Sequence, residues 1–512
     1  MSGLLFWGPL LRMAEALILS LPTLLTGFLV AGVLRRLLGY SATRRLFGGD
    51  SWRAIPQAWA LGMLLPVCSL GVIPILRELR RAGVSGGAIL AFALTAPLFN
   101  PISILYGLTL ADPVVIFSFS AGSLVVVTVV GGIWDWWYPG TGQSTDEPPQ
   151  VAWGIKRMLA VAVVALRELT GPSLGYLAIG LLGVALLSVV LPHGVLQTSA
   201  EAGDLSAPLL MSCVAVPAYA TPITAMTQVA SMFQHGNSVG AAFALLVLGA
   251  GTNLGMVAWM VRQYGGRRTA VWFGWLMGIV LLLAYGVDRP LHPTGVEPAG
   301  HTHAFDGYCC PFQTGLVNPA SAAWQALDDR LDRPTLFLLA ILGLASVGGL
   351  LLRYGDNAAR LERWLEHAPE QRLRLDPVLP APVLGVVTLA GLIAASVFGC
   401  YLYYPPVGDI LEDLHAVNAQ VVTAAHTRDW EHALHWIPYY DDWTRKLQVS
   451  VVLRGGRLSD YQRWKARLLR DKLERLEHEL EDREVEEARR WATEVQRAQR
   501  RLSAAYRPAA AR

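Results

Sequence analysis

Long apolar runs separated by short polar segments dominate this chain. A helix that crosses a bilayer needs about 20 mostly apolar residues, and several runs reach that length. The first run is too long and begins too late for the apolar core of a signal peptide. No small-residue cleavage site follows it, so we expect it to be retained. The pattern predicts an all-α polytopic membrane protein with about eight transmembrane helices. The expected spans are 12–34, 88–108, 114–134, 172–192, 239–261, 269–286, 334–352 and 381–403.

An apolar segment at 57–76 does not fit a simple span. Arginines cluster before it at 35–45 and after it at 77–81, and arginines close to a span mark the cytoplasmic side. A re-entrant hairpin returns the chain to the side from which it entered. Its tip would be Pro66–Pro74, where proline and glycine free backbone groups that only protein or a water-filled cavity can cover.

An internal repeat follows this hairpin. Residues 82–100 return as residues 235–253 at a constant offset of 153 residues, which is typical of repeat architectures. A second proline-broken segment, Met211–Met226, precedes the second copy, and no Lys or Arg lies between Glu201 and Arg262. We therefore expect the second hairpin to enter from outside, which makes an inverted repeat as in many secondary transporters. The matched residues are Gly83 with Gly236, Ser85 with Ser238, Gly87 with Gly240, Ala91 with Ala244, and Asn100 with Asn253.

These features divide the chain into six parts. A cytoplasmic linker with an amphipathic helix separates the two repeats, and an external loop and a two-helix membrane hairpin follow them. A soluble helical domain ends the sequence, and its leucines at 469, 473, 476 and 480 have two interpretations: a dimerising coiled coil or a helix packed on its own domain. The expected parts are 1–139, 140–170, 171–286, 287–333, 334–403 and 404–512.

Composition narrows the function classes. The 512 residues are 53% hydrophobic and only 16% charged, with a mean hydropathy of +0.39, which excludes an ordinary soluble enzyme with one core. The formal net charge of +3 says little by itself. The chain contains neither a phosphate-binding Gly-Lys-Ser/Thr motif nor a dinucleotide glycine fingerprint, so we expect no ATP-driven transport.

The string PVCSLGVIPILRELRRAGVSGGAILAFALTAPLFNP then identifies a family. It resembles the signature of the predicted-permease family that includes the organoarsenical efflux permease ArsP, over roughly residues 10–286. The resemblance implies a plasma-membrane exporter, with trivalent organoarsenicals as substrates of some members. Leu70 stands where the family usually has its second cysteine, so a thiol pair is missing at this tip. The matching residues are Cys68, Ser69, Gly71, Pro74, Gly83, Gly87, Pro97, Asn100 and Pro101.

Polar and conformationally special residues of the two tips are the candidates for substrate binding. Cys68 and Cys213 offer soft sulfur atoms to a thiophilic centre, although each also suits the role of a small buried apolar residue. Asn100 and Asn253 are expected either to line the pore or to bond neighbouring helices. The full predicted set is Cys68, Ser69, Gly71, Pro74, Asn100, Cys213, Pro217, Pro222 and Asn253.

Other positions have structural or open interpretations. The repeated glycines 83, 87, 236 and 240 are expected to allow close helix packing. Glu15 is the only acid well inside the first apolar run. A carboxylate in a membrane is a functional candidate by default, but Glu15 lies near the outer end of its span, so the alternative expectation is that it simply reaches water.

The external loop is a second candidate site. Imidazole and thiolate ligands suit zinc or copper, and the loop gathers both kinds of side chain. Three interpretations stay open: metal or metalloid binding, a disulfide on this oxidising side, or a plain loop. The candidate ligands are His292, His301, His303, Asp306, Cys309 and Cys310.

The hypothesis that best joins these features is a permease of the inner or plasma membrane. It exports a small solute, a metalloid or metal species, by alternating access, with a substrate site between the hairpin tips. No cofactor is certain, apart from the zinc or copper that the external loop could bind. The expected partners are the substrate and the lipid bilayer. A homo-oligomer that forms through the C-terminal helix is an open alternative. The alternative function is a non-transporting membrane metalloprotein or assembly scaffold. An enzyme is not expected, because no base accompanies the cysteines.

Overall fold

The computed structural model describes residues 2–140, 146, 155–201, 203–293, 302–312, 318–328, 330–354, 357–366 and 380–507. Every regular element in these ranges is a helix. The chain divides into two compact units, the first made of residues 1–104 and 113–396 and the second of residues 105–112 and 397–512.

The first repeat begins with one long helix that turns into a short π-helix and ends at Gly39, whose φ is 77°. Two short helices separated by a seven-residue break then form the predicted hairpin. Its elements are α1 (Ser2–Val33), η1 (Leu34–Leu38), α2 (Tyr40–Leu46), α3 (Ala54–Leu64), α4 (Val72–Arg81), α5 (Gly86–Thr95), α6 (Pro101–Leu110) and α7 (Pro113–Trp137).

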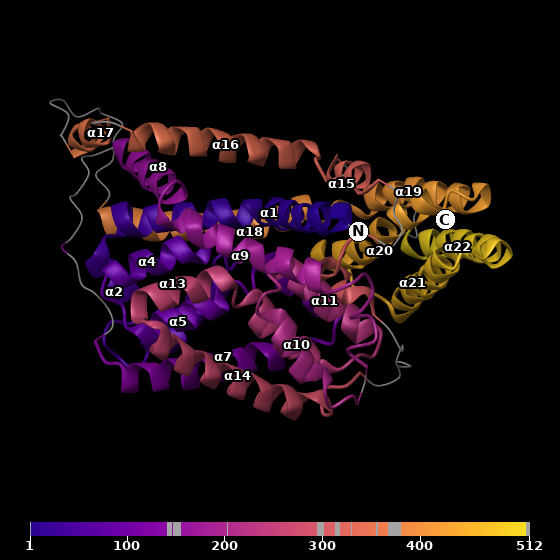
Figure 1. Ribbon diagram of the computed structural model, residues 1–512, viewed down its shortest axis with the longest axis horizontal. Coiled ribbons are helices and arrows are strands. Elements are labelled where there is room, and N and C mark those ends of the chain that lie inside the picture. The colour runs from indigo at the N-terminus through magenta and orange to yellow at the C-terminus, as the bar shows by residue number, and fades with distance from the viewer. Residues whose placement is uncertain are drawn as a thin grey trace. The chain divides into compact units, whose positions relative to one another are not determined.

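The linker helix α8 precedes the second repeat, which again has a long helix, a hairpin, a broken helix and a second long helix in this order. Its hairpin is again two helices around a break, at 216–221. Figure 1 shows α2 and α4 toward one end of α1, and α10 and α11 toward the other end. The linker helix is α8 (Ile155–Leu169), and the elements of the second repeat are α9 (Pro172–Val190), α10 (Ala207–Ala215), α11 (Pro222–Gln234), α12 (Val239–Ala244), η2 (Leu245–Ala250), α13 (Leu254–Tyr264) and α14 (Gly266–Asp288).

Six helices of the described residues are long and apolar enough to span a membrane, fewer than the eight expected. The difference lies in the spans expected at 88–108 and 239–261. The first is split into α5 and α6. The second bends by 58° between η2 and α13. The six unbroken candidates are Gly3–Leu38, Pro113–Trp137, Pro172–Val190, Gly266–Asp288, Arg333–Arg353 and Pro382–Tyr403.

Local chemistry explains both breaks. Pro101 begins α6, and a proline without an N–H suits the first turn of a helix and not its interior. Asn100 and Asn253 precede α6 and α13, and the side-chain oxygen of each accepts a backbone N–H of the following turn. An asparagine cap of this kind starts a new helix instead of continuing the old one.

Four further α-helices and one 3-10 helix follow in the described part of residues 287–403. The loop expected at 287–333 contains a 3-10 turn and the short helix α15, which the sequence pattern did not predict. Most of the 140–150 linker lies outside the described residues. The elements are η3 (His303–Tyr308), α15 (Pro319–Asp328), α16 (Arg333–Arg353), α17 (Asn357–Glu366) and α18 (Ala381–Tyr403).

The second unit contains a bundle of four helices. Each helix is longer than 20 residues, and Ser459 with Gln462 forms a capping box at the start of the third. Buried apolar side chains from all four helices form one core. The helices are α19 (Val407–Thr427), α20 (Trp430–Leu453), α21 (Asp460–Glu481) and α22 (Val485–Tyr506).

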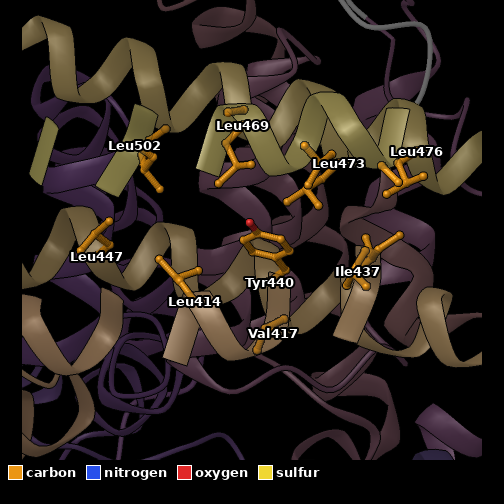
Figure 2. Close-up of a cluster of buried hydrophobic side chains, with 14 of the residues drawn as sticks. Leu414, Val417, Ile437, Tyr440, Leu447, Leu469, Leu473, Leu476 and Leu502 are labelled. Atoms are coloured by element: carbon orange, nitrogen blue, oxygen red, sulfur yellow. The ribbon is translucent and has the colours of Figure 1, made fainter. Parts of the chain in front are cut away.

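The leucine stripe of α21 lies inside this bundle. Leu469, Leu473 and Leu476 point toward Tyr440 and Ile437 of α20 (Figure 2), and each leucine is at most 2% exposed. The stripe therefore packs on its own domain, as the second interpretation has it, because its apolar seam is already covered.

Candidate functional site

The first hairpin tip is buried and held against α1. Cys68 and Ser69 lie in the break between α3 and α4 and are fully buried. The backbone N–H of Gly71 donates to the Cys68 sulfur at 3.4 Å. A Cβ on Gly27 of α1 would lie 2.1 Å from the Gly71 carbonyl oxygen, so only glycine permits this approach. Pro74 is buried in the first turn of α4.

Asn253 joins this tip to the other repeat. Its Nδ2 donates to the Ser69 carbonyl oxygen at 2.8 Å, and its Oδ1 accepts from the Met256 N–H at 2.9 Å. Asn100 makes the equivalent cap, since its Oδ1 accepts from the Ser103 N–H at 2.7 Å. Both asparagines therefore stabilise helix starts, and Asn253 also bonds a neighbouring segment across 184 residues of chain.

The second tip brings Tyr219 to Cys68. Both residues belong to one buried cluster with Leu70 and Leu177. The Tyr219 hydroxyl interacts with Cys68 and with Ser20 of α1. The sequence analysis missed Tyr219 and Ser20, although Tyr219 lies between the two prolines of the predicted second tip.

The remaining candidates of the second tip have other positions. Cys213 is exposed on α10, whereas Cys68 is buried. Pro217 lies in the break, and a Cβ on Gly183 of α9 would be 2.6 Å from its carbonyl oxygen. Pro222 is the first residue of α11. The structure therefore brings Tyr219, and not Cys213, to the first tip.

Each repeat also contains an equivalent aspartate that accepts hydrogen bonds from the start of a helix. Asp135 of α7 accepts from the Ser85 hydroxyl at 2.9 Å and from the Gly87 N–H at 2.7 Å. Asp288 of α14 accepts from the Ser238 hydroxyl at 2.7 Å and from the Gly240 N–H at 2.8 Å. The two aspartates are themselves 153 residues apart, so extending the repeat offset would have found them.

The repeated glycines have two different roles. A Cβ on Gly87 would lie 2.3 Å from the Gly131 carbonyl oxygen, and one on Gly240 would lie 2.5 Å from that of Ala284. These two glycines permit close helix packing, as expected. Gly83 and Gly236 instead have φ of 76° and 65°, which ends α4 and α11 at little cost only when the residue is glycine.

An ionic network ties α4 to the end of the linker helix α8. Glu168 of α8 pairs with Arg77, accepts from the Ser173 hydroxyl at 2.9 Å and lies 3.7 Å from Arg81. Arg81 also pairs with Glu78, which is fully buried. The amphipathic linker helix therefore packs the polar end that carries Glu168 against the first hairpin.

The outer loop is docked on the membrane part of the first unit. Arg12 of α1 donates to the carbonyl oxygens of Cys309 at 3.1 Å and Asp306 at 2.6 Å. Arg12 and Arg330 both pair with Glu15, at 2.8 and 2.9 Å. Glu15 is 7% exposed, so the expectation that it reaches water was wrong, because two arginines neutralise it in place.

The loop's metal site stays a prediction. Among the described residues, no three side chains of the ligating types lie close enough to hold a metal ion. His301 lies outside the described residues, and the side chain of His303 is not described. Burial raises the pKa of the Cys309 thiol, which disfavours the thiolate that a metal needs. Both Cys309 and Cys310 are free thiols.

Fold and site together define a multi-pass α-helical membrane protein with two broken helices. Buried polar residues lie where the first hairpin tip meets the break before α13. The chain belongs to the predicted permease family ArsP_1, which matches residues 10–288. It is similar to UPF0718 protein YcgR of Bacillus subtilis (strain 168), with 27% identity over 273 residues that cover 52% of this chain and 92% of the relative. No solved structure matches the chain. The description of this family as permeases supports a membrane transporter.

Proposed function

We propose that this chain is an efflux permease of the inner or plasma membrane. It carries a small solute, a metalloid or metal species, by alternating access between two inverted repeats. The substrate site lies where the first hairpin tip meets the break before α13. The contact between Asn253 and the Ser69 carbonyl carries this proposal, because it makes one buried junction from both repeats.

The order of helix ends supports the inversion. Arg80 lies in the last turn of α4. Its guanidinium group donates to the Gln263 side chain and lies over the ring of Tyr264, at the end of α13. Helix α5 starts directly after α4, at this end of the unit. Helix α12 starts beside Asp288, at the far end of the long helix α14. The two equivalent helices therefore start from opposite ends, as an inverted repeat requires.

The chemistry of the junction supports a soft substrate. Cys68 supplies a buried sulfur atom, and sulfur ligands favour soft centres. The resemblance to organoarsenical exporters points the same way. The absent second thiol, replaced by Leu70, argues for a substrate that one sulfur atom suffices to bind.

Flux through the purified chain tests the proposal. The purified chain would be reconstituted into inside-out vesicles, and the uptake of trivalent organoarsenicals, arsenite, antimonite and divalent metals would be measured in turn. Saturable flux of one solute, lost in Cys68→Ser and in Asn253→Ala, is the expected result. Absence of flux for every solute, together with metal bound by the full-length chain, would favour the non-transporting metalloprotein instead.

A matched control separates transport from folding. Cys213→Ser also removes a thiol, but this thiol is exposed on α10, whereas that of Cys68 is buried. It is expected to keep most of the flux. A Cys213→Ser variant as defective as Cys68→Ser would contradict a site built on the first tip.

A further inference from the structure

A pocket lies between α7 and α14, the last helices of the two repeats. These helices run side by side (Figure 1). Trp137 and Trp275, one from each helix, are 42% and 43% exposed, and their rings meet edge to face at 6.0 Å. The pocket therefore opens onto the outer surface of two helices that are apolar enough to span a membrane. Its aromatic lining consists of Trp134, Trp137, Tyr138, Trp272 and Trp275.

A positive charge lies beside this apolar pocket. The guanidinium carbon of Arg268 is 5.0 Å from the centre of the Tyr138 ring. Arg268 precedes Trp272 by four residues and Trp275 by seven, so the helical period places all three on one face of α14. Arg267 and Arg268 are both exposed, and neither forms an ion pair with a described residue. Two uncompensated cations therefore lie at one end of the pocket.

The start of α14 adds hydrogen-bond donors at the same end. The helix begins at Gly266, and Gly265 before it supplies no side-chain cap. A Cβ on either glycine would meet nothing within 4 Å, so the space around the first turn is open. The N–H groups of a first turn have no partner inside the helix and favour an anion. An anionic group fits beside Arg268, next to a pocket that suits an apolar chain.

The internal repeat shows that the fold does not require these side chains. The offset of 153 residues relates each position of α7 to one of α14 and its end. None of the equivalent positions is a tryptophan or an arginine, so the aromatic pocket and its charge belong to one end of this helix pair. The equivalents are Val287 for Trp134, Pro290 for Trp137, Val115 for Arg268, Phe119 for Trp272 and Gly122 for Trp275.

We propose that α7 and α14 together bind one anionic phospholipid. Part of an acyl chain lies in the aromatic pocket, and the phosphate group is bound by Arg268 and the first-turn N–H groups of α14. Tryptophan and tyrosine suit the level where acyl chains meet headgroups. Basic residues between membrane helices on the cytoplasmic side suit anionic headgroups. The lipid contacts both repeats, and the inference does not depend on which solute is transported.

Native mass spectrometry of the delipidated full-length chain tests this site. The chain in detergent would be titrated with dioleoyl phosphatidylglycerol and, separately, with dioleoyl phosphatidylcholine, which has the same acyl chains and no net charge. The first phosphatidylglycerol is expected to bind at least about fivefold more tightly than phosphatidylcholine. Arg268→Gln should weaken phosphatidylglycerol binding by roughly fivefold and leave phosphatidylcholine binding unchanged.

Two matched controls locate the site. Arg262 is also exposed, in the last turn of α13, and does not line the pocket, so Arg262→Gln should bind both lipids like the unmodified chain. Trp136 is 78% exposed and lies outside the pocket. Trp137→Leu should weaken both lipids by roughly threefold, because it removes apolar contact area, and Trp136→Leu should not. Equal thermal midpoints of the two tryptophan variants would show that folding is unaffected.

Each contrary result overturns a stated part of the inference. Equal affinity of the unmodified chain for both lipids would overturn the anionic preference. Equal losses in Arg262→Gln and Arg268→Gln would show a diffuse surface charge and overturn the site, and equal losses in the two tryptophan variants would overturn the pocket. Glycerol 3-phosphate carries the phosphate without acyl chains and should not compete at the same concentration. Competition by it would overturn the lipid and favour a soluble phosphate compound.

Discussion

The paired aspartate contacts predict that one chemical change has unequal effects in the two repeats. Asp288 accepts both of its hydrogen bonds on a single oxygen, Oδ1. Asp135 uses both oxygens, Oδ1 for the Gly87 N–H and Oδ2 for the Ser85 hydroxyl. An asparagine keeps one acceptor oxygen and replaces the other with an NH₂ group. Asp135→Asn should therefore cost more stability than Asp288→Asn.

The structure sets the size of the difference. Asp288→Asn keeps both bonds and loses only the charge, which costs about 1 kcal/mol at most. Asp135→Asn also loses the charge-assisted bond that the Ser85 hydroxyl donates to Oδ2, because the NH₂ group that takes the place of this oxygen cannot accept a proton from Ser85. A hydrogen bond to a charged group contributes about 1.5–3 kcal/mol. We expect a loss of about 2 kcal/mol, or roughly a 30-fold increase in local opening.

Hydrogen exchange of the full-length chain measures this opening directly. Peptides from the first turns of α5 and α12 would be compared in both variants. Exchange in α5 should accelerate by roughly 30-fold in Asp135→Asn, and exchange in α12 by about fivefold or less in Asp288→Asn. Asp332→Asn is the control, because Asp332 caps α16 by accepting from Thr335 and touches neither helix. Equal acceleration in the two repeats, or none in α5, would refute the reasoning.

Three further predictions concern other parts of the chain. Burial raises the pKa of the Cys309 thiol, so Cys309 forms the reactive thiolate only at higher pH than usual. It should react with an alkylating reagent at least tenfold more slowly than Cys310 near pH 8, and the difference in rate should narrow as the pH rises. Equal rates would contradict the burial of Cys309. Leu476→Ala should destabilise the C-terminal bundle by about 2–5 kcal/mol in chemical denaturation of the full chain without changing its oligomeric mass, and a change of mass would favour a coiled-coil dimer. Glu168→Gln leaves the half-buried Arg77 without its counter-charge, which costs about 3–5 kcal/mol for a buried pair, so the thermal midpoint in detergent should fall; an unchanged midpoint would show that the pair is solvated.

Much of the helical architecture could be predicted from residue pattern alone. Apolar run length predicted the six unbroken spans, since each run must match the thickness of a bilayer. Proline and glycine at Pro66–Pro74 and at Met211–Met226 predicted the breaks of both hairpins. These properties act between residues that are close in the chain, so the sequence alone contains them.

The predicted spans failed where a local cap outweighed hydropathy. Residues 88–108 and 239–261 are apolar enough to cross a membrane, yet Asn100 and Asn253 divide them. The capping bonds to Ser103 and Met256 span only three residues. This feature was present in the sequence, and the proline and asparagine beside it are the signals that reveal it.

The chemistry of the junction depended on the tertiary structure. The approach of Tyr219 to Cys68 joins segments about 150 residues apart, and the Asn253 bond to Ser69 joins segments 184 residues apart. The exposure of Cys213, one of the two expected sulfur ligands, likewise follows from which face of α10 is covered. The sequence by itself determined the helices, their breaks and the repeat, because short-range sterics and bilayer thickness govern them. Only the folded chain decided which polar side chains meet, because that depends on packing between segments distant in sequence.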